Sequence, residues 1–342
     1  MFATRTIASF CCACILTMAA GTAQAVASPR PGYIFALTQL GRGFNPALVA
    51  PSYVDGLALQ IGWHELEPEP GQYRWDRLDA MVGAAAARGK KVTLHVLPLH
   101  PPEWIFDEGA QAFTFTMGRR GGGPNAGRQM REVLPWDPVF LDRWEKLTTD
   151  LGRHYNGNDA VLAVSVTAPS PEMALPGGIP GTDSFLQLEK LYSKDVYFRA
   201  WKRMIDVYQA AFPDKAKLLV PGIVLIDEDF ADDVVTYAHG RYGDRLWLFN
   251  AGLRAGGVPQ AHILRGHVGD ILTGYAARGG RLGLQTIWSS TDDPNGRMQG
   301  TLHEALDAGL KMGASYFEIY AVDVQNSDLQ SELSDLKHRL GG

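Results

Sequence analysis

The sequence predicts a single-domain (β/α)8 TIM barrel, in which eight parallel strands close into a ring that helices cover on the outside. Short runs rich in Val, Ile, Leu and Phe alternate with longer amphipathic stretches from residue 33 to the C-terminus. Eight such runs fit the eight strands of a barrel in a chain of 342 residues. A doubly wound open sheet is the alternative, but no Gly-x-Gly-x-x-Gly run follows an early strand, so a dinucleotide site is not supported.

The eight predicted strands are short and apolar, as expected for parallel strands that are buried on both faces. They cover residues 33–37, 56–61, 91–97, 161–167, 217–225, 246–251, 282–287 and 316–321. Between them, apolar residues recur at the three- and four-residue spacing of amphipathic helices. The predicted helices cover residues 75–88, 138–155, 194–212, 229–242, 263–278, 300–311 and 327–340.

Two connections are long, residues 98–137 after the third strand and residues 168–193 after the fourth. Both follow strands at the end of the barrel where active sites form. We expect them to lack regular secondary structure, and loops of this length are typically lids or binding loops. In the first, Arg119 and Arg120 precede three glycines; we interpret this piece as a hinge with two solvated arginines, because the lysine pattern of a phosphate loop is absent.

The N-terminus has the pattern of a secretory signal peptide over residues 1–25. Arg5 precedes an apolar run over residues 7–20, and Ala23-Gln24-Ala25 forms a small-x-small cleavage pattern. The apolar run is shorter than the ~20 residues that a membrane-spanning helix requires. We therefore expect a periplasmic or secreted protein whose catalytic barrel covers residues 26–342. All three cysteines precede the cleavage point, so the processed chain would have no disulfide and no thiol nucleophile.

The composition excludes several other classes. The chain has 46% hydrophobic and 20% charged residues with a net charge of −5, which does not fit an intrinsically disordered protein. The charge also lacks the basic excess that a nucleic-acid surface needs. We expect no nucleic-acid partner and no membrane partner after signal cleavage.

The most specific stretch is WHELEPEPGQYRWDRLD at residues 63–79, with PLHPPEW at residues 98–104 extending the pattern. It resembles the start of glycoside hydrolases of the large retaining (β/α)8 clan, especially bacterial β-galactosidase-like and cellulase-like members. In these, a tryptophan ends strand two, and a Glu-Pro-x-x-Gly-x-Tyr-x-Trp/Phe run leads into the helix. Turn and capping residues such as Pro68, Gly71 and Asp76 also explain the stretch as architecture. It therefore indicates the barrel and its lineage more strongly than an activity.

The resemblance implies catalytic glutamates at the ends of strands four and seven. The sequence departs from this pattern twice, because Thr167-Ala168 stands where the clan has Asn-Glu, and Gln285 lies close to the position of the nucleophile. A neutral amide cannot attack an anomeric carbon as a carboxylate does. The retaining mechanism of the clan is therefore not expected to operate here in its usual form.

Two other glutamates are the candidate catalytic carboxylates. Glu172 follows strand four, and Glu318 lies inside the apolar run of strand eight, where it must face the barrel interior or mouth or pair with a buried base. We interpret Glu172 as the general acid, Glu318 as the base or electrostatic stabiliser, and Asp323 as the reserve for the second carboxylate. Strands four and eight lie across the barrel from each other, and a wide carboxyl separation favours inversion of the anomeric configuration.

Aromatic and polar residues at strand ends and in the following loops suit a carbohydrate ligand, because indole rings can stack on the apolar faces of sugars. The candidate substrate-binding residues are Trp63, Glu65, His95, Trp104, Trp136, Gln285, Trp288, Tyr320 and Asp323. The histidines and carboxylates match no zinc spacing, so we expect no metal site and no organic cofactor.

The best interpretation is an exported glycoside hydrolase that cleaves an oligo- or polysaccharide with a carboxylate pair. The departures at Thr167-Ala168 and Gln285 leave open a catalytically inactive barrel that binds carbohydrate. A polysaccharide lyase that uses a Tyr or His base is a third possibility, which Arg119, Arg120 and Arg128 favour because they could bind an acidic sugar.

Overall fold

The computed structural model describes residues 31–38, 45–116, 127–169, 183–221, 229–258 and 268–341. The predicted signal peptide, the Arg119-Arg120 piece and Glu172 lie outside these residues, so the expectations attached to them stay predictions.

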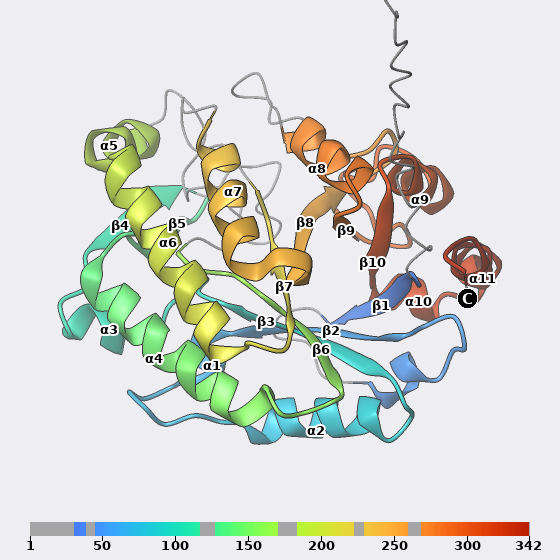
Figure 1. Ribbon diagram of the computed structural model, residues 1–342, viewed down its shortest axis with the longest axis horizontal. Helices are drawn as coiled ribbons and strands as arrows, with labels where there is room; N and C mark the ends of the chain where they lie inside the picture. Colours follow the sequence, from blue (N-terminus) through green and yellow to red (C-terminus); the bar gives the residue numbers. More distant parts are fainter. Residues whose placement is uncertain are drawn as a thin grey trace, which may run out of the picture. The chain divides into compact units, whose positions relative to one another are not determined.

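Eight parallel strands form a closed barrel, which confirms the predicted fold class (Figure 1). Around the barrel the order is β1-β10-β9-β8-β7-β6-β3-β2. The strands are β1 (Tyr33–Thr38), β2 (Gly56–Gly62), β3 (Lys91–Leu97), β6 (Val161–Ser165), β7 (Ala216–Leu219), β8 (Leu246–Leu253), β9 (Arg281–Thr286) and β10 (Ala314–Tyr320). Their residues are almost all buried, because the interior of the ring covers one face and the helices cover the other.

Strand β7 is shorter than the predicted 217–225 and is followed by Pro221, which has no N–H to give to a neighbouring strand. The N-terminal end of the barrel is closed by side chains from three strands. The guanidinium of Arg281 lies over the rings of Trp247 and Tyr33, at 4.7 and 5.3 Å from their centroids. It also donates a hydrogen bond to the Pro31 carbonyl. This end is therefore a packed floor.

The helices lie close to their predicted positions, because their apolar faces and caps can be read locally. For example, α4 (Pro138–Tyr155) begins after Asp137, whose carboxylate accepts a hydrogen bond from the Phe140 N–H at 3.0 Å. The other long helices are α2 (Asp76–Ala86), α6 (Lys194–Ala211), α7 (Phe230–Tyr242), α8 (Val268–Ala277), α9 (Leu302–Lys311) and α11 (Gln330–Arg339). In the described part of the chain, no helix has the length and apolarity needed to cross a membrane.

The two long connections are more ordered than predicted, which corrects the expectation of structureless loops. The connection after β3 holds α3 (Trp104–Asp107) and a two-stranded antiparallel sheet of β4 (Ala112–Thr116) and β5 (Gln129–Val133). Every second residue of β4 is buried, since Phe113 and Phe115 face inward between exposed threonines. The connection after β6 ends in α5 (Asp183–Leu191), which lies beside β4 (Figure 1). The alternating sequence of β4 is a strand signal that the apolar-run criterion missed.

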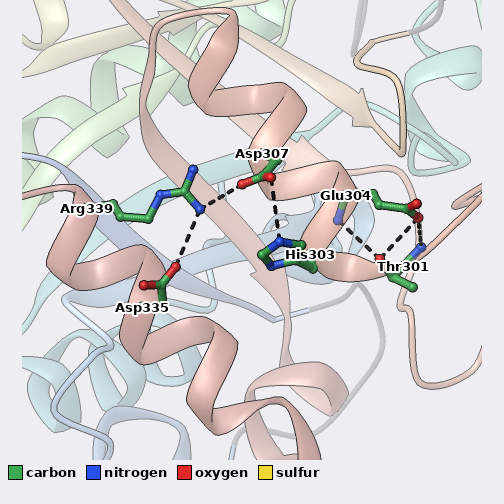
Figure 2. Close-up of polar contacts among 6 residues, drawn as sticks. All are labelled: Thr301, His303, Glu304, Asp307, Asp335 and Arg339. Carbon is green, nitrogen blue, oxygen red and sulfur yellow. Dashed lines mark hydrogen bonds and ion pairs between the residues drawn. The ribbon is translucent and has the colours of Figure 1, made fainter.

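An exposed network of charged side chains joins the C-terminal helix α11 to α9 (Figure 2). Arg339 donates to Asp307 at 2.7 Å and lies 3.4 Å from Asp335. At the start of α9, Thr301 and Glu304 form a reciprocal capping box. These ion pairs connect α11 to α9. Because they are exposed, we expect them to contribute little to stability.

Candidate active site

A glutamate that sits inside strand β10 points into the barrel. The side chain of Glu318 has no exposed surface, and its Oε1 atom lies 2.9 Å from Nε2 of His95 on β3. Strands β10 and β3 are separated by β1 and β2 in the ring, so this contact crosses the interior. Both expectations for Glu318 are met together, since it faces the interior and pairs with a buried base.

Tyr316 completes this interior group. Its hydroxyl lies 2.7 Å from Oε1 of Glu318 and 2.8 Å from Oγ1 of Thr93. Burial, and then the charge of Glu318, raises the pKa of the Tyr316 hydroxyl well above its usual value. The phenol therefore stays protonated, and its O–H group donates a hydrogen bond to the carboxylate. Oε2 of Glu318, by contrast, is buried and has no hydrogen-bond partner among the described residues.

Gln285 of β9 lies directly beside Glu318. The two residues are register partners in the parallel pair of β9 and β10, so their side chains emerge on the same face of the sheet. Gln285 is buried, with 5% of its surface exposed. The neutral amide predicted for strand seven thus lies next to the one carboxylate that strand eight places inside the barrel.

Beyond the end of β9, the rings of Trp288 and Tyr320 lie 5.9 Å apart. Trp288 is partly exposed, and its Nε1 donates to the Asp292 carbonyl at 2.7 Å. The guanidinium of Arg297 lies over the same indole, 4.7 Å from its centroid. Trp288 thus follows the C-terminal end of β9 and Tyr320 is the buried last residue of β10, so both lie at the end of the barrel where a sugar platform is expected.

Asp323 binds the loop that follows β9, a role that the sequence did not indicate. It has no exposed surface and accepts hydrogen bonds from the Ser289 hydroxyl and from the N–H groups of Ser290 and Thr291, all within 2.9 Å. These contacts hold the loop that follows β9. These contacts favour a structural role for Asp323, and its role as the reserve carboxylate stays a prediction.

Three other predicted binding residues belong to the packing around β2 and the following turn. Trp63 is fully buried, and its ring packs on Trp104 and Trp144 at 5.4 and 5.3 Å. Glu65 forms an ion pair with Arg77. The prediction that Trp63 binds sugar conflicts with this placement, because a ring without exposed surface offers no platform; Trp104, which is partly exposed, packs against it edge-on.

The remaining predicted aromatic residue, Trp136, is partly buried between Tyr192 and Tyr197, with ring centroids 6.1 and 5.5 Å away. The structure therefore brings together His95, Gln285 and Glu318 within the barrel, and Trp288 and Tyr320 at the C-terminal ends of β9 and β10. It does not bring Trp63, Glu65 or Trp136 to that group. Among the described residues, no cluster of three or more His, Cys, Asp or Glu side chains is arranged to hold a metal ion.

The structure adds one titratable residue that the sequence did not reveal. Glu132 lies on β5 with 5% of its surface exposed, and its Oε1 accepts a hydrogen bond from the His100 N–H at 3.2 Å. Burial raises the pKa of Glu132 to about 7. No local signal marks this residue, because its burial depends on packing within the β4–β5 sheet.

We expect the burial of Glu132 to make the stability of the protein depend on pH. The pKa of this carboxyl is about 7 in the folded protein and 4.5 as its ordinary value. The folded state therefore keeps the proton at pH values where the unfolded chain releases it, so stability falls as the pH rises from 4.5 to about 7. The shift corresponds to about 3 kcal/mol.

Glu132→Gln should remove this pH-dependent part of the free energy of unfolding. Urea unfolding of both proteins from pH 4 to pH 8 is the measurement, and the variant should gain stability relative to the wild type across this window. A constant difference at all pH values would contradict the assignment.

Comparison with known proteins agrees with the sequence resemblance. Residues 57–168 match the family model described as beta-galactosidase. The beta-galactosidase of Thermus thermophilus is 31% identical over 102 residues, which are 30% of this chain and 15% of that protein. Beta-galactosidase BbgII of Bifidobacterium bifidum is 30% identical over 108 residues, 31% of this chain and 15% of that protein. The chain thus spans 15% of the length of these relatives.

Solved structures show the same barrel at low sequence identity. The catalytic domain of beta-amylase from Paenibacillus polymyxa has a TM-score of 0.56 at 10% identity, over 90% of this chain and 98% of that one. Endo-glycoceramidase II from Rhodococcus sp. has a TM-score of 0.53 at 16% identity, over 89% and 78% of the two chains.

Fold and matched segment together define a (β/α)8 barrel of the kind found in glycoside hydrolases. Within this class, the similarity in sequence is to the beta-galactosidases, and it covers the motif at residues 63–79. The predicted resemblance is therefore confirmed.

Proposed function

We propose that this protein hydrolyses glycosidic bonds of an oligo- or polysaccharide at the C-terminal end of its barrel. One observation carries the proposal: the segment that forms strands two to four of the barrel matches the beta-galactosidase family. The proposed substrate platform is the partly exposed ring of Trp288, which follows strand seven and packs against Tyr320, the buried last residue of strand eight.

Glu318 acts in this proposal as an electrostatic stabiliser. Glycosidic cleavage passes through an oxocarbenium-like state that carries positive charge, and a buried carboxylate favours such a charge. The side chain has no exposed surface and one of its oxygens is held by His95 and Tyr316. These contacts favour stabilisation over attack on the sugar.

The sequence predicts Glu172 as the general acid, and the buried Glu132 is the alternative. Inversion is the proposed stereochemistry. Its support is that strand seven carries Gln285 in place of a carboxylate, so no enzyme nucleophile is available there. A water molecule would then attack the anomeric carbon directly. Export is proposed from the signal pattern of residues 1–25.

The test is an assay of the purified protein on nitrophenyl β-galactosides and on a panel of plant and bacterial polysaccharides. We expect release of nitrophenol or reducing sugar, and a loss of at least about 100-fold in kcat/KM for Glu318→Gln. Asp335→Asn is the matched control, because it removes an exposed carboxylate on α11 and should leave kcat/KM unchanged.

The alternatives give different results in the same assay. Binding of a glycan without cleavage would replace the proposal by the inactive barrel, which the neutral side chain of Gln285 favours. Products that absorb in the ultraviolet through a new double bond would identify a lyase. Proton NMR of the first product reports the stereochemistry, and retention of configuration would overturn the inverting assignment.

A further inference from the structure

We propose that Glu132 is the general acid of this site and that His100 holds it in place. The proposal rests on the proposed glycosidase function, and it assigns the proton donor to the β4–β5 sheet. The clan pattern would place this donor at the end of strand four, where the sequence has Thr167-Ala168.

The position of Glu132 in the fold is the first support. Strand β5 belongs to the connection that follows β3, so it lies at the end of the barrel where the strands carry active sites. His100 comes three residues after the end of β3, and His64 comes two residues after the end of β2. Because Glu132 contacts His100, the acid lies beside the segment that follows β3.

Local packing explains why this carboxyl is buried. Glu132 is the register partner of Phe113 in the antiparallel pair, so it lies on the apolar face of the sheet, where Phe113 stacks with Phe115. Its neighbour Arg131 is on the opposite face, where it pairs with Glu103 and lies over the Phe106 ring. In the described part of the chain, Glu132 has no ion pair with a lysine or arginine.

The contacts of Glu132 leave one oxygen for a substrate. Oε1 accepts from the His100 N–H at 3.2 Å and lies 3.8 Å from Nδ1 of the same residue. Oε2 makes no hydrogen bond with the described residues, and 7% of the side chain is exposed. The backbone of His100 has a φ of +50°, a conformation that is rare for a residue other than glycine and is found preferentially at functional sites.

The protonation of the pair fits acid catalysis. Burial raises the pKa of Glu132 to about 7, and burial together with the nearby charge of His64 lowers the pKa of His100. Around pH 7 a large share of the carboxyl groups thus still carries a proton, and the lowered pKa of His100 favours the neutral imidazole. A carboxylic acid tuned toward neutrality is the group that protonates a glycosidic oxygen.

In the proposed step, Glu132 gives one proton to the leaving group and later regains one. The proton on Oε2 of Glu132 passes to the glycosidic oxygen while the bond between that oxygen and the anomeric carbon breaks. Water supplies the hydroxyl group that bonds to the anomeric carbon, and its remaining proton is released to solvent. Glu132 then regains a proton from solvent, next to the exposed ring of His100.

The experiment compares two β-galactosides that differ in the leaving group, 2,4-dinitrophenyl and phenyl. Dinitrophenolate leaves without protonation, whereas phenolate needs an acid. Glu132→Gln should lower kcat/KM for the phenyl substrate by at least about 100-fold and change that for the dinitrophenyl substrate by less than about threefold. The decline of wild-type kcat/KM above pH 7, expected from deprotonation of Glu132, should vanish in the variant.

Two further variants separate catalysis from folding. Glu132→Asp keeps an acid on a shorter side chain, so it should recover part of the activity on the phenyl substrate. Glu103→Gln removes an exposed carboxylate near the same sheet and should act like the wild type. Equal losses on both substrates, or no loss on either, would overturn the assignment while the glycosidase function stands. A wild type that cleaves no glycoside at all would overturn the proposed function, and the assignment with it.

Discussion

Glu318→Ala is expected to lower the free energy of unfolding by about 3–5 kcal/mol, because two buried polar groups lose a hydrogen-bond partner and a cavity opens. The variant leaves Nε2 of His95 and the hydroxyl of Tyr316 without their carboxylate in an interior that has no exposed surface at this point. A small cavity adds to this cost, because the surrounding strands are held by the closed ring.

A double-mutant cycle with His95→Ala measures the coupling within this pair. Urea unfolding of the wild type, both single variants and the double variant should show that the double variant loses less than the sum of the singles. Additive losses would mean that the 2.9 Å contact between His95 and Glu318 carries no coupling. A matched apolar pair, His95→Phe with Glu318→Leu, should fold with near-normal stability, which would show that the polar pair is not required for the fold.

Much of the barrel could be predicted because its signals are local. The third strand is the run KVTLHVL, and its predicted bounds equal those of β3, Lys91–Leu97. The helix at Pro138–Tyr155 was also predicted with its observed ends, since Asp137 and Pro138 mark its start. Hydrophobic period and capping chemistry are sufficient for such elements, because neither depends on distant residues.

The candidate site could be predicted only in part. A glutamate inside the apolar run of β10 indicated an interior position for Glu318, and this prediction is confirmed. Its partner His95 lies 223 residues away in the sequence, and only the closed ring brings β3 and β10 face to face. The burial of Glu132 could not be predicted for the same reason, since it is created by packing of the β4–β5 sheet.

The departure from the clan pattern at Gln285 can be located in the barrel. Gln285 and Glu318 occupy neighbouring register positions on β9 and β10, so the negative charge lies one strand away from its expected place. Removal of the nucleophile from strand seven and retention of a buried carboxylate beside it favour charge stabilisation over covalent catalysis. In the proposed hydrolysis, cleavage would then depend on a water molecule and on an acid elsewhere at the barrel mouth.

Trp63→Ala is expected to lower the free energy of unfolding by about 3–5 kcal/mol, the usual cost of removing a buried tryptophan. The ring of Trp63 packs on Trp104, Phe140 and Trp144 at 5.3–5.8 Å. Its Nε1 also donates to Oε2 of Glu67 at 2.8 Å. Burial raises the pKa of Glu67 against this hydrogen bond, so loss of the donor should raise that pKa further.

Two measurements on Trp63→Ala separate a role in core packing from the predicted role in sugar binding. They are thermal and urea unfolding, and titration with a sugar. A core residue should lose stability while the folded fraction binds sugar as the wild type does. Trp288→Ala is the matched control: its ring is partly exposed, so stability should change by about 1 kcal/mol or less while sugar binding weakens. A stable Trp63→Ala that no longer binds sugar would restore the original prediction. It would also require that the cluster of Trp63, Trp104 and Trp144 opens when the ligand enters.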